Sequence, residues 1–177
     1  LSWKIAPALA TGNCVIAKPS EITPMTAYLL AKACIEAGLP KGVLSIVHGL
    51  GPKAGQAIVE HPKIKAISFT GGTSTGQRIA AVAAPMFKKL SLELGGKSPF
   101  IVFADAVLES AVNAQVSGIF AASGQSCVAG SRLVIEDSIC DAFLTRIREK
   151  AEAVVSGAPD DAAPEGGPLF TRAQARH

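Results

Sequence analysis

The sequence has few charged and few aromatic residues for its length. Of its 177 residues, 18% are charged and 5% are aromatic, whereas 49% are hydrophobic. The net charge of +3 is spread along the chain, so neither a basic face for nucleic acid nor a nucleic-acid partner is predicted. Uninterrupted apolar stretches are all too short to span a bilayer, and we expect no membrane partner. A globular chain that buries one core, or parts of two, is predicted.

Cysteine and histidine are too scattered for a disulfide framework or a metal centre. The four cysteines, Cys14, Cys34, Cys127 and Cys140, show no close pairing. A chain of this size and hydrophobicity does not need disulfides, so we expect reduced thiols and a cytoplasmic location. The three histidines stand at no ligand spacing from each other or from the cysteines, and no metal site is predicted.

Short β-branched runs alternate with longer helical patterns, which is typical of βαβ units and a largely parallel sheet. The first of these helices is expected to have Thr23 as N-cap and Pro24 at its first position, and to stop at Gly38. The expected strands cover 14–19, 42–49, 65–72, 88–96, 99–105 and 132–136, and the other expected helices cover 53–61, 73–84, 108–122 and 138–154. Residues 157–168, rich in Pro, Gly and Asp, are predicted to form a loop.

Two glycine-rich turns lie where a predicted strand leads into a helix. Gly49, Gly51 and Ala54 fit a G-x-G-x-x-A pattern, in which backbone amides approach a pyrophosphate. The fit is weak alone, because no acidic residue ends the next strand. The second turn, Gly71 to Gly76, suits an anion but lacks the residues of a Walker loop. The alternative is that both turns simply require small residues.

Glu93 lies between two leucines in the predicted strand 88–96. On strict alternation it shares a face with Ser91 and Gly95, so its carboxylate either points to water or is enclosed. An enclosed carboxylate without a partner is costly, and it would be suited to act as a general base toward water. A turn at Gly95 and Gly96 is expected to follow, and we place a domain boundary there, between 1–94 and 95–177.

Cys127 stands in a run of glycine, serine and alanine that carries no charge until Arg132. By default a cysteine among small residues is a buried apolar side chain. The alternative is a reactive thiol, for which small neighbours would leave room for a substrate. These two interpretations are left open by the local sequence.

Four motifs in fixed order resemble the NAD(P)-dependent aldehyde dehydrogenase superfamily: KPSEITP, FTGGTSTG, LELGGKSP and GQSCVAGSR. The similarity covers practically the whole chain and corresponds to the central segment of the family's chain. It implies an α/β fold, in which a Rossmann-like parallel sheet flanked by helices runs into the start of an α/β catalytic domain. Residues 1–94 would then be the C-terminal part of the NAD-binding domain, and 95–177 the N-terminal part of the catalytic domain.

The resemblance also implies roles for individual residues. Cys127 would be the nucleophile and Glu93 the base that activates the deacylating water, while the other three cysteines remain apolar filler. The implied cofactor-binding residues are Lys18 and Glu21 at the adenosine ribose, together with Gly51, Gly71, Gly72, Thr73, Gly76 and Leu94. NAD is expected rather than NADP, because the Glu21 carboxylate would repel a 2′-phosphate.

A longer enzyme is implied as well, since the family's oxyanion-hole Asn and its oligomerisation strand would lie outside this segment. We therefore expect a small aldehyde as substrate, a homo-oligomer at full length, and no activity from the 177 residues alone. One alternative is a truncated, inactive dinucleotide-binding module. Another is the branch that passes the thioester to coenzyme A; that branch typically lacks the base carboxylate, so Glu93 favours hydrolysis.

Overall fold

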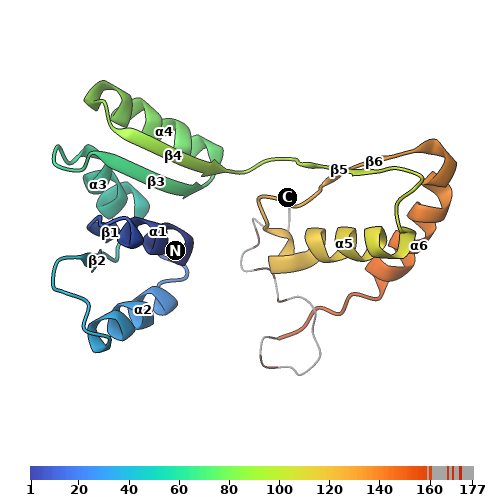
Figure 1. Ribbon diagram of the computed structural model, residues 1–177, viewed down its shortest axis with the longest axis horizontal. Coiled ribbons are helices and arrows are strands. Elements are labelled where there is room, and N and C mark those ends of the chain that lie inside the picture. The colour runs from blue at the N-terminus through green and yellow to red at the C-terminus, as the bar shows by residue number, and fades with distance from the viewer. Residues whose placement is uncertain (159, 161–166, 168, 170–171, 173–177) are drawn as a thin grey trace. The chain divides into compact units, whose positions relative to one another are not determined.

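The computed structural model describes residues 1–158, 160, 167, 169 and 172. The chain divides into two compact units, Leu1–Leu94 and Gly95–His177 (Figure 1). The assignment of these units to cofactor binding and to catalysis remains a prediction. Much of the predicted loop 157–168, namely 159, 161–166 and 168, lies outside the described residues.

The first unit contains two pairs of parallel strands. Its elements, in chain order, are α1 (Ser2–Ala10), β1 (Val15–Ala17), α2 (Met25–Glu36), β2 (Leu44–Ile46), the π-helical turn η1 (Gly51–Gly55), α3 (Gln56–Glu60), β3 (Ala66–Gly71), α4 (Thr73–Ala83), the 3₁₀ turn η2 (Ala84–Met86) and β4 (Lys89–Leu94). Strand β1 pairs with β2, and β3 pairs with β4. The parallel pairing predicted from the alternating pattern is thereby confirmed.

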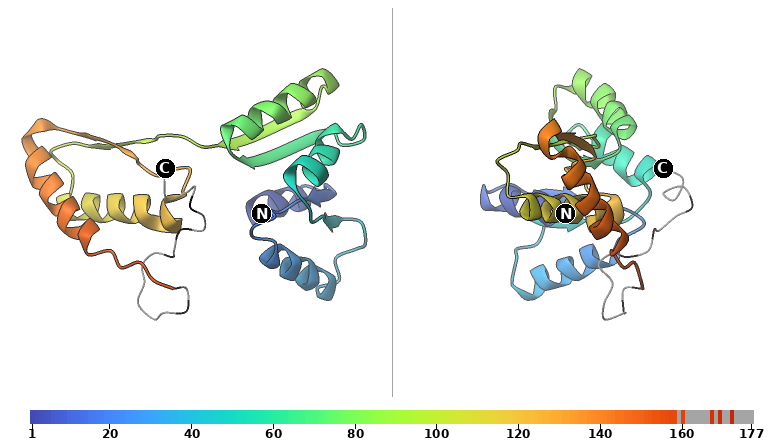
Figure 2. Two further views of the ribbon diagram at one scale, coloured as in Figure 1. Left: turned by 180° about the vertical axis from the view of Figure 1, so that it is seen from behind. Right: turned by 90° about the vertical axis from the view of Figure 1, so that its right-hand side faces the viewer.

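The second unit is a βαβα arrangement. It consists of β5 (Pro99–Val102), α5 (Leu108–Phe120), the short turn η3 (Ala121–Gly124), β6 (Arg132–Ile135), the 3₁₀ turn η4 (Asp137–Ile139) and α6 (Cys140–Glu152). Strands β5 and β6 are parallel, and both helices cover one face of the pair (Figures 1 and 2). The core of this unit is formed by Val102, Val112, Val116 and Phe143.

Three local predictions were wrong. Pro24, not Thr23, is the N-cap of α2, because the Pro24 carbonyl accepts the bond from the Tyr28 amide while Thr23 closes a turn onto Ser20. The predicted start of helix 53–61 was wrong, because the α-helix α3 begins only at Gln56 and the residues before it form the π-helical η1. Residues 95–98 contain no turn, because β4 and β5 each pair with a parallel partner instead of with each other.

Lys88 is a buried cation that joins the start of β4 to the end of α3. Its ammonium donates hydrogen bonds to the backbone carbonyls of Val59 and, at 2.8 Å, of His61. The last carbonyls of a helix lack intrahelical partners, and a cation there also favours the helix dipole. Lys88 therefore closes α3 at its C-terminal end.

Within the described residues, no helix is both long enough and apolar enough to cross a membrane. The longest helices, α5 and α6, have 13 residues each.

The core of the second unit generates a stability prediction. Phe143 is fully buried, whereas its neighbour Leu144 on α6 is partly exposed. We expect Phe143→Ala to lower the free energy of unfolding by about 3–5 kcal/mol. The matched change Leu144→Ala should cost about 1 kcal/mol or less. Urea denaturation followed by circular dichroism measures both, and equal losses would contradict this description of the core.

Candidate functional site

The candidate cofactor residues follow the carboxyl ends of parallel strands in the first unit. Lys18 comes directly after β1, the turn that contains Gly51 follows β2, and Thr73 follows β3. Leu94 ends β4 and is the register partner of Gly71. In open α/β sheets, ligands bind outside the carboxyl ends of the strands. Lys18 and Gly51 thus follow the strands of the β1–β2 pair, and Thr73 and Leu94 lie at the ends of the β3–β4 pair, in each case at the end where a ligand is expected.

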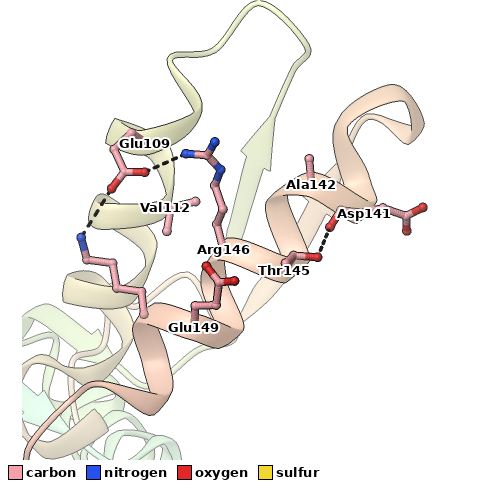
Figure 3. Close-up of a pocket in the computed structure, with 8 residues that line it drawn as sticks. Glu109, Val112, Asp141, Ala142, Thr145, Arg146 and Glu149 are labelled. Carbon is pink, nitrogen blue, oxygen red and sulfur yellow. Dashed lines mark hydrogen bonds and ion pairs between the residues drawn. The ribbon is translucent and has the colours of Figure 1, made fainter.

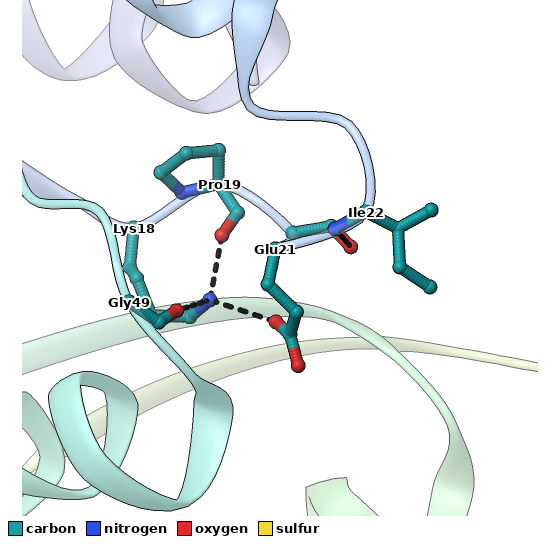
Figure 4. Close-up of polar contacts among 6 residues, drawn as sticks. Lys18, Pro19, Glu21, Ile22 and Gly49 are labelled. Carbon is teal, nitrogen blue, oxygen red and sulfur yellow. Dashed lines mark hydrogen bonds and ion pairs between the residues drawn. The ribbon is translucent and has the colours of Figure 1, made fainter.

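Lys18 ties the loop after β1 to the loop after β2 (Figure 4). Its Nζ donates to the carbonyl of Pro19 at 2.6 Å, to the carbonyl of Gly49 at 3.1 Å and to Glu21 Oε2 at 3.4 Å. An ammonium has three hydrogens, so each of them has an acceptor. The bond to Glu21 is the longest of the three.

Glu21 presents an exposed carboxylate beside Lys18, and 43% of its side chain is accessible. Its pKa is lowered by a hydrogen bond from its own backbone amide, then by the bond from Lys18, with a smaller contribution from the Gly51 amide. The carboxylate is consequently charged throughout the neutral pH range. It can accept hydrogen bonds from hydroxyl groups and repels anions.

The N-terminus of α4 is open to an anion. Gly72 is the N-cap in an extended conformation, and no side chain of the described residues caps the helix. A Cβ added to Gly72 would meet no described atom within 4 Å. The first amides of a helix point outward and attract negative charge. The backbone from Gly72 to Thr73 has the space and the donors that a phosphate requires.

At Gly76 the missing side chain allows close packing and does not leave open space. It is buried in α4, and an added Cβ would lie 2.7 Å from Leu94 Cδ2. The missing side chain lets α4 approach β4, along which it lies in Figure 1. Gly51, in contrast, opens η1, and an added Cβ there would meet no described atom within 4 Å.

Glu93 is exposed in the first unit. Along β4, Ser91 and Glu93 are exposed whereas Leu90, Leu92 and Leu94 are partly buried, as strict alternation predicts. The backbone of Glu93 is fixed by its register with Thr70 on β3. The sequence left open whether the Glu93 carboxylate points to water or is enclosed. Within its unit, Glu93 lies on the exposed face of β4.

Cys127 lies on an exposed turn of the second unit. The turn is closed by a 3.2 Å hydrogen bond from the Ala129 amide to the Ser126 carbonyl. The Cys127 thiol is free and its residue is exposed, so the default interpretation as a buried apolar side chain is wrong. Cys14 is also exposed, which corrects its expected role as filler, whereas Cys34 and Cys140 are partly buried.

Comparison with known proteins identifies the family. The family model "Aldehyde dehydrogenase family" matches residues 1–177. The chain belongs to the aldehyde dehydrogenase family. This confirms the resemblance drawn from the four motifs and the Rossmann-like α/β fold that it implied.

Relatives of this aldehyde dehydrogenase segment are longer than the segment. A (Z)-2-((N-methylformamido)methylene)-5-hydroxybutyrolactone dehydrogenase of Acinetobacter baylyi is 52% identical over 97% of this chain and 35% of its own length. The 2-aminomuconic semialdehyde dehydrogenase of Homo sapiens is 48% identical over 98% of this chain and 36% of its own. The chain thus spans about a third of the length of the curated relatives it matches.

A solved structure shows the same arrangement with a cofactor bound. Betaine aldehyde dehydrogenase from Staphylococcus aureus, in complex with NAD+, is 40% identical and has a TM-score of 0.91. The match covers 99% of this chain and 35% of that one. The α/β architecture described above is therefore the architecture of the corresponding part of that enzyme.

The sequence did not predict one residue that contacts the chain just after Cys127. Gln115 is buried in α5, and its Nε2 donates to the carbonyl of Gly130 at 2.8 Å. The only signal in the sequence is an amide side chain within an otherwise apolar helical pattern. Such a signal indicates a partner but does not identify it.

A cleft of about 710 Å³ lies between α5 and α6 and is apart from the candidate residues (Figure 3). Glu109 forms ion pairs there with Arg146 at 3.1 Å and with Lys150 at 3.8 Å. None of the candidate site residues is among those that line this cleft. The charges pair the two helices with each other, and exposed pairs of this kind contribute little to stability.

Proposed function

We propose that this segment supplies the nucleophile, the deacylating base and most of the cofactor site of an enzyme that oxidises a small aldehyde to a carboxylic acid. The observation that carries the proposal is an exposed thiol, Cys127, within the GQSC motif of a family member. Cys14 is exposed as well but lies outside the motif. The roles assigned to Cys127 and Glu93 fall in different units of the chain.

NAD+ is the cofactor we infer, and the residues present fit it. The Glu21 carboxylate would accept bonds from the adenosine ribose while Lys18 holds it in place. The backbone from Gly71 to Thr73 would hold the pyrophosphate at the open N-terminus of α4, which Gly76 lets pack against β4, and Gly51 and Leu94 would complete the site. When bound, NAD+ supplies the acceptor for the hydride that the substrate loses.

Cys127 begins the proposed reaction. Its thiolate attacks the aldehyde carbon, a C–S bond forms, and the carbonyl π electrons move to oxygen to give a thiohemiacetal. The backbone amide of Cys127 is suited to receive this oxyanion. Loss of a hydride from the same carbon restores the carbonyl and leaves a thioester on Cys127. One difficult oxidation is thereby divided into two easier steps.

Glu93 completes the proposed cycle. Its carboxylate removes a proton from water, and the oxygen attacks the thioester carbon. The C–S bond breaks, the carboxylic acid leaves, and the Cys127 thiolate is restored. The proton accepted by Glu93 passes to solvent, for which its exposed position is suited.

The assignment of Cys127 is tested by Cys127→Ala in the natural full-length enzyme. We expect aldehyde oxidation to fall by about a thousandfold or more, equivalent to about 4 kcal/mol of barrier. NAD+ binding should persist, because the proposed cofactor residues lie in the other unit. Cys14→Ala is the matched control and should leave turnover unchanged. Turnover above a tenth of wild type in Cys127→Ala would refute the assignment.

Glu93→Gln tests the deacylation step. Removing the base should leave one rapid equivalent of NADH per active site and slow subsequent turnover by about 10²–10⁴-fold. Stopped-flow absorbance separates the two phases, and Ser91→Ala, on the same exposed face of β4, serves as the control. An unchanged steady state without a burst would mean that the base is a different group.

Glu21→Gln tests the cofactor preference. A neutral amide no longer repels a 2′-phosphate, so the ratio of kcat/KM for NADP+ to that for NAD+ should rise about tenfold or more. Because the pKa of Glu21 is lowered from its ordinary value of 4.5, the carboxylate is charged at both pH 6 and pH 8, so the titration of Glu21 itself should not change the ratio between these pH values. Glu36→Gln, at the exposed end of α2, is the control. A ratio that stays at the wild-type value would assign the preference to another residue.

A further inference from the structure

The side chains at the tip of the turn that carries Cys127 point away from the protein and do not anchor it. Cys127 is exposed, and 79% of Val128 is accessible. The chain returns to the protein at Ala129, which is buried and whose amide closes the turn onto Ser126. The position of the thiol therefore depends on how the residues that follow Val128 are fixed.

Gly130, three residues after Cys127, is enclosed between β5 and α5. An added Cβ would lie 2.7 Å from Phe100 Cβ and 3.1 Å from Gln115 Oε1. The Cβ of Phe100 is attached directly to the backbone of β5, so it cannot rotate away as the end of a side chain can. The turn is thus seated against the sheet at a point where only glycine fits.

Gln115 fixes Gly130 by a hydrogen bond. Its side chain is 6% exposed, and its Nε2 donates to the Gly130 carbonyl at 2.8 Å. Its neighbours on α5, Val112 and Val116, are buried in the apolar core. Burying an amide in such surroundings is costly unless it is hydrogen-bonded. An apolar side chain would serve the packing of α5 equally well, so the amide is explained by the carbonyl it binds.

The upstream end of the turn is strained. Ala122 and Ser123 have φ angles of 52° and 55°, and Gly124 follows at 74°. Left-handed conformations cost energy for residues other than glycine and persist only where the surroundings impose them. The turn therefore has a constrained segment before Cys127 and a second fixed point after it, at Gly130.

We propose that Gln115 is a positioning residue for Cys127: by holding the Gly130 carbonyl it fixes the height and orientation of the turn that presents the thiol. The inference rests on the proposed function, in which Cys127 is the nucleophile. Displacing a reacting group by about 1 Å can cost about a hundredfold in rate. Gln115 therefore acts on the formation of the thiohemiacetal, although its side chain does not touch the substrate.

Gln115→Leu in the natural full-length enzyme tests the proposal. The single-turnover rate constant of NADH formation should fall about tenfold or more. The Kd for NAD+ should remain within about twofold of wild type, because the proposed cofactor residues lie in the first unit. Alkylation of Cys127 by iodoacetamide should also stay within about twofold, since the thiol remains exposed and this reagent needs no fixed approach. A single-turnover rate within twofold of wild type would overturn the proposal.

Two further variants separate positioning from packing. Val112→Ala, in the core on the same helix, should lower stability but leave the single-turnover rate within twofold, and an equal loss of rate would overturn the proposal. Gly130→Ala adds a Cβ that would clash with Phe100 and shift the Gly130 carbonyl, so it should cause the same loss of rate as Gln115→Leu. It also provides a test if Gln115→Leu does not fold. A wild-type rate in Gly130→Ala overturns the proposal as well. Retained turnover in Cys127→Ala would instead refute the proposed function itself.

Discussion

The parallel register between β3 and β4 is the constraint on which most of the candidate site in the first unit depends. Six consecutive residue pairs, from Ala66 with Lys89 to Gly71 with Leu94, fix the two strands against each other. The register places the start of the glycine turn beside the end of β4. It also sets Glu93 one residue before that end, on the exposed face. A slip of one residue would turn Glu93 onto the packed face and expose Leu94.

Glycine has two distinct functions in this segment, and the structure separates them. At Gly72 the absence of a side chain leaves open space at a helix N-terminus, where a phosphate can approach amides. At Gly76 and Gly130 the absence of a side chain lets one element approach another, α4 onto β4 and the Cys127 turn onto β5. The single glycine-rich turn from Gly71 to Gly76 therefore combines open space at a helix N-terminus with close packing.

The sequence predicted the features that depend on local periodicity and on motif order. The alternation along β4, the helix after Thr73 and the parallel strand pairs follow from patterns within a few residues of each other. Features that depend on the choice of hydrogen-bond partner were missed. Pro24 displaced Thr23 as the N-cap of α2 because a local turn engaged Thr23, and no turn formed after β4 because its partner is β3.

The hydrogen-bond partners of buried polar groups could not be predicted from the sequence. Lys88 binds carbonyls at the end of α3, and Gln115 binds the carbonyl of Gly130, 15 residues away. Each residue type is unexceptional in its own segment, and the carbonyl that it binds is contributed by tertiary structure. The same holds for Lys18, whose bond to Gly49 spans 31 residues.

Cys127 carries the covalent intermediate of the proposed reaction. The most direct measurement is the site of acylation in the Glu93→Gln enzyme, quenched with acid after mixing with aldehyde and NAD+ and mapped by peptide mass spectrometry. One acyl group per chain is expected, on the peptide that contains Cys127. An acyl group on Cys14, which is also exposed, or turnover without any acyl adduct would show that Cys127 is not the nucleophile.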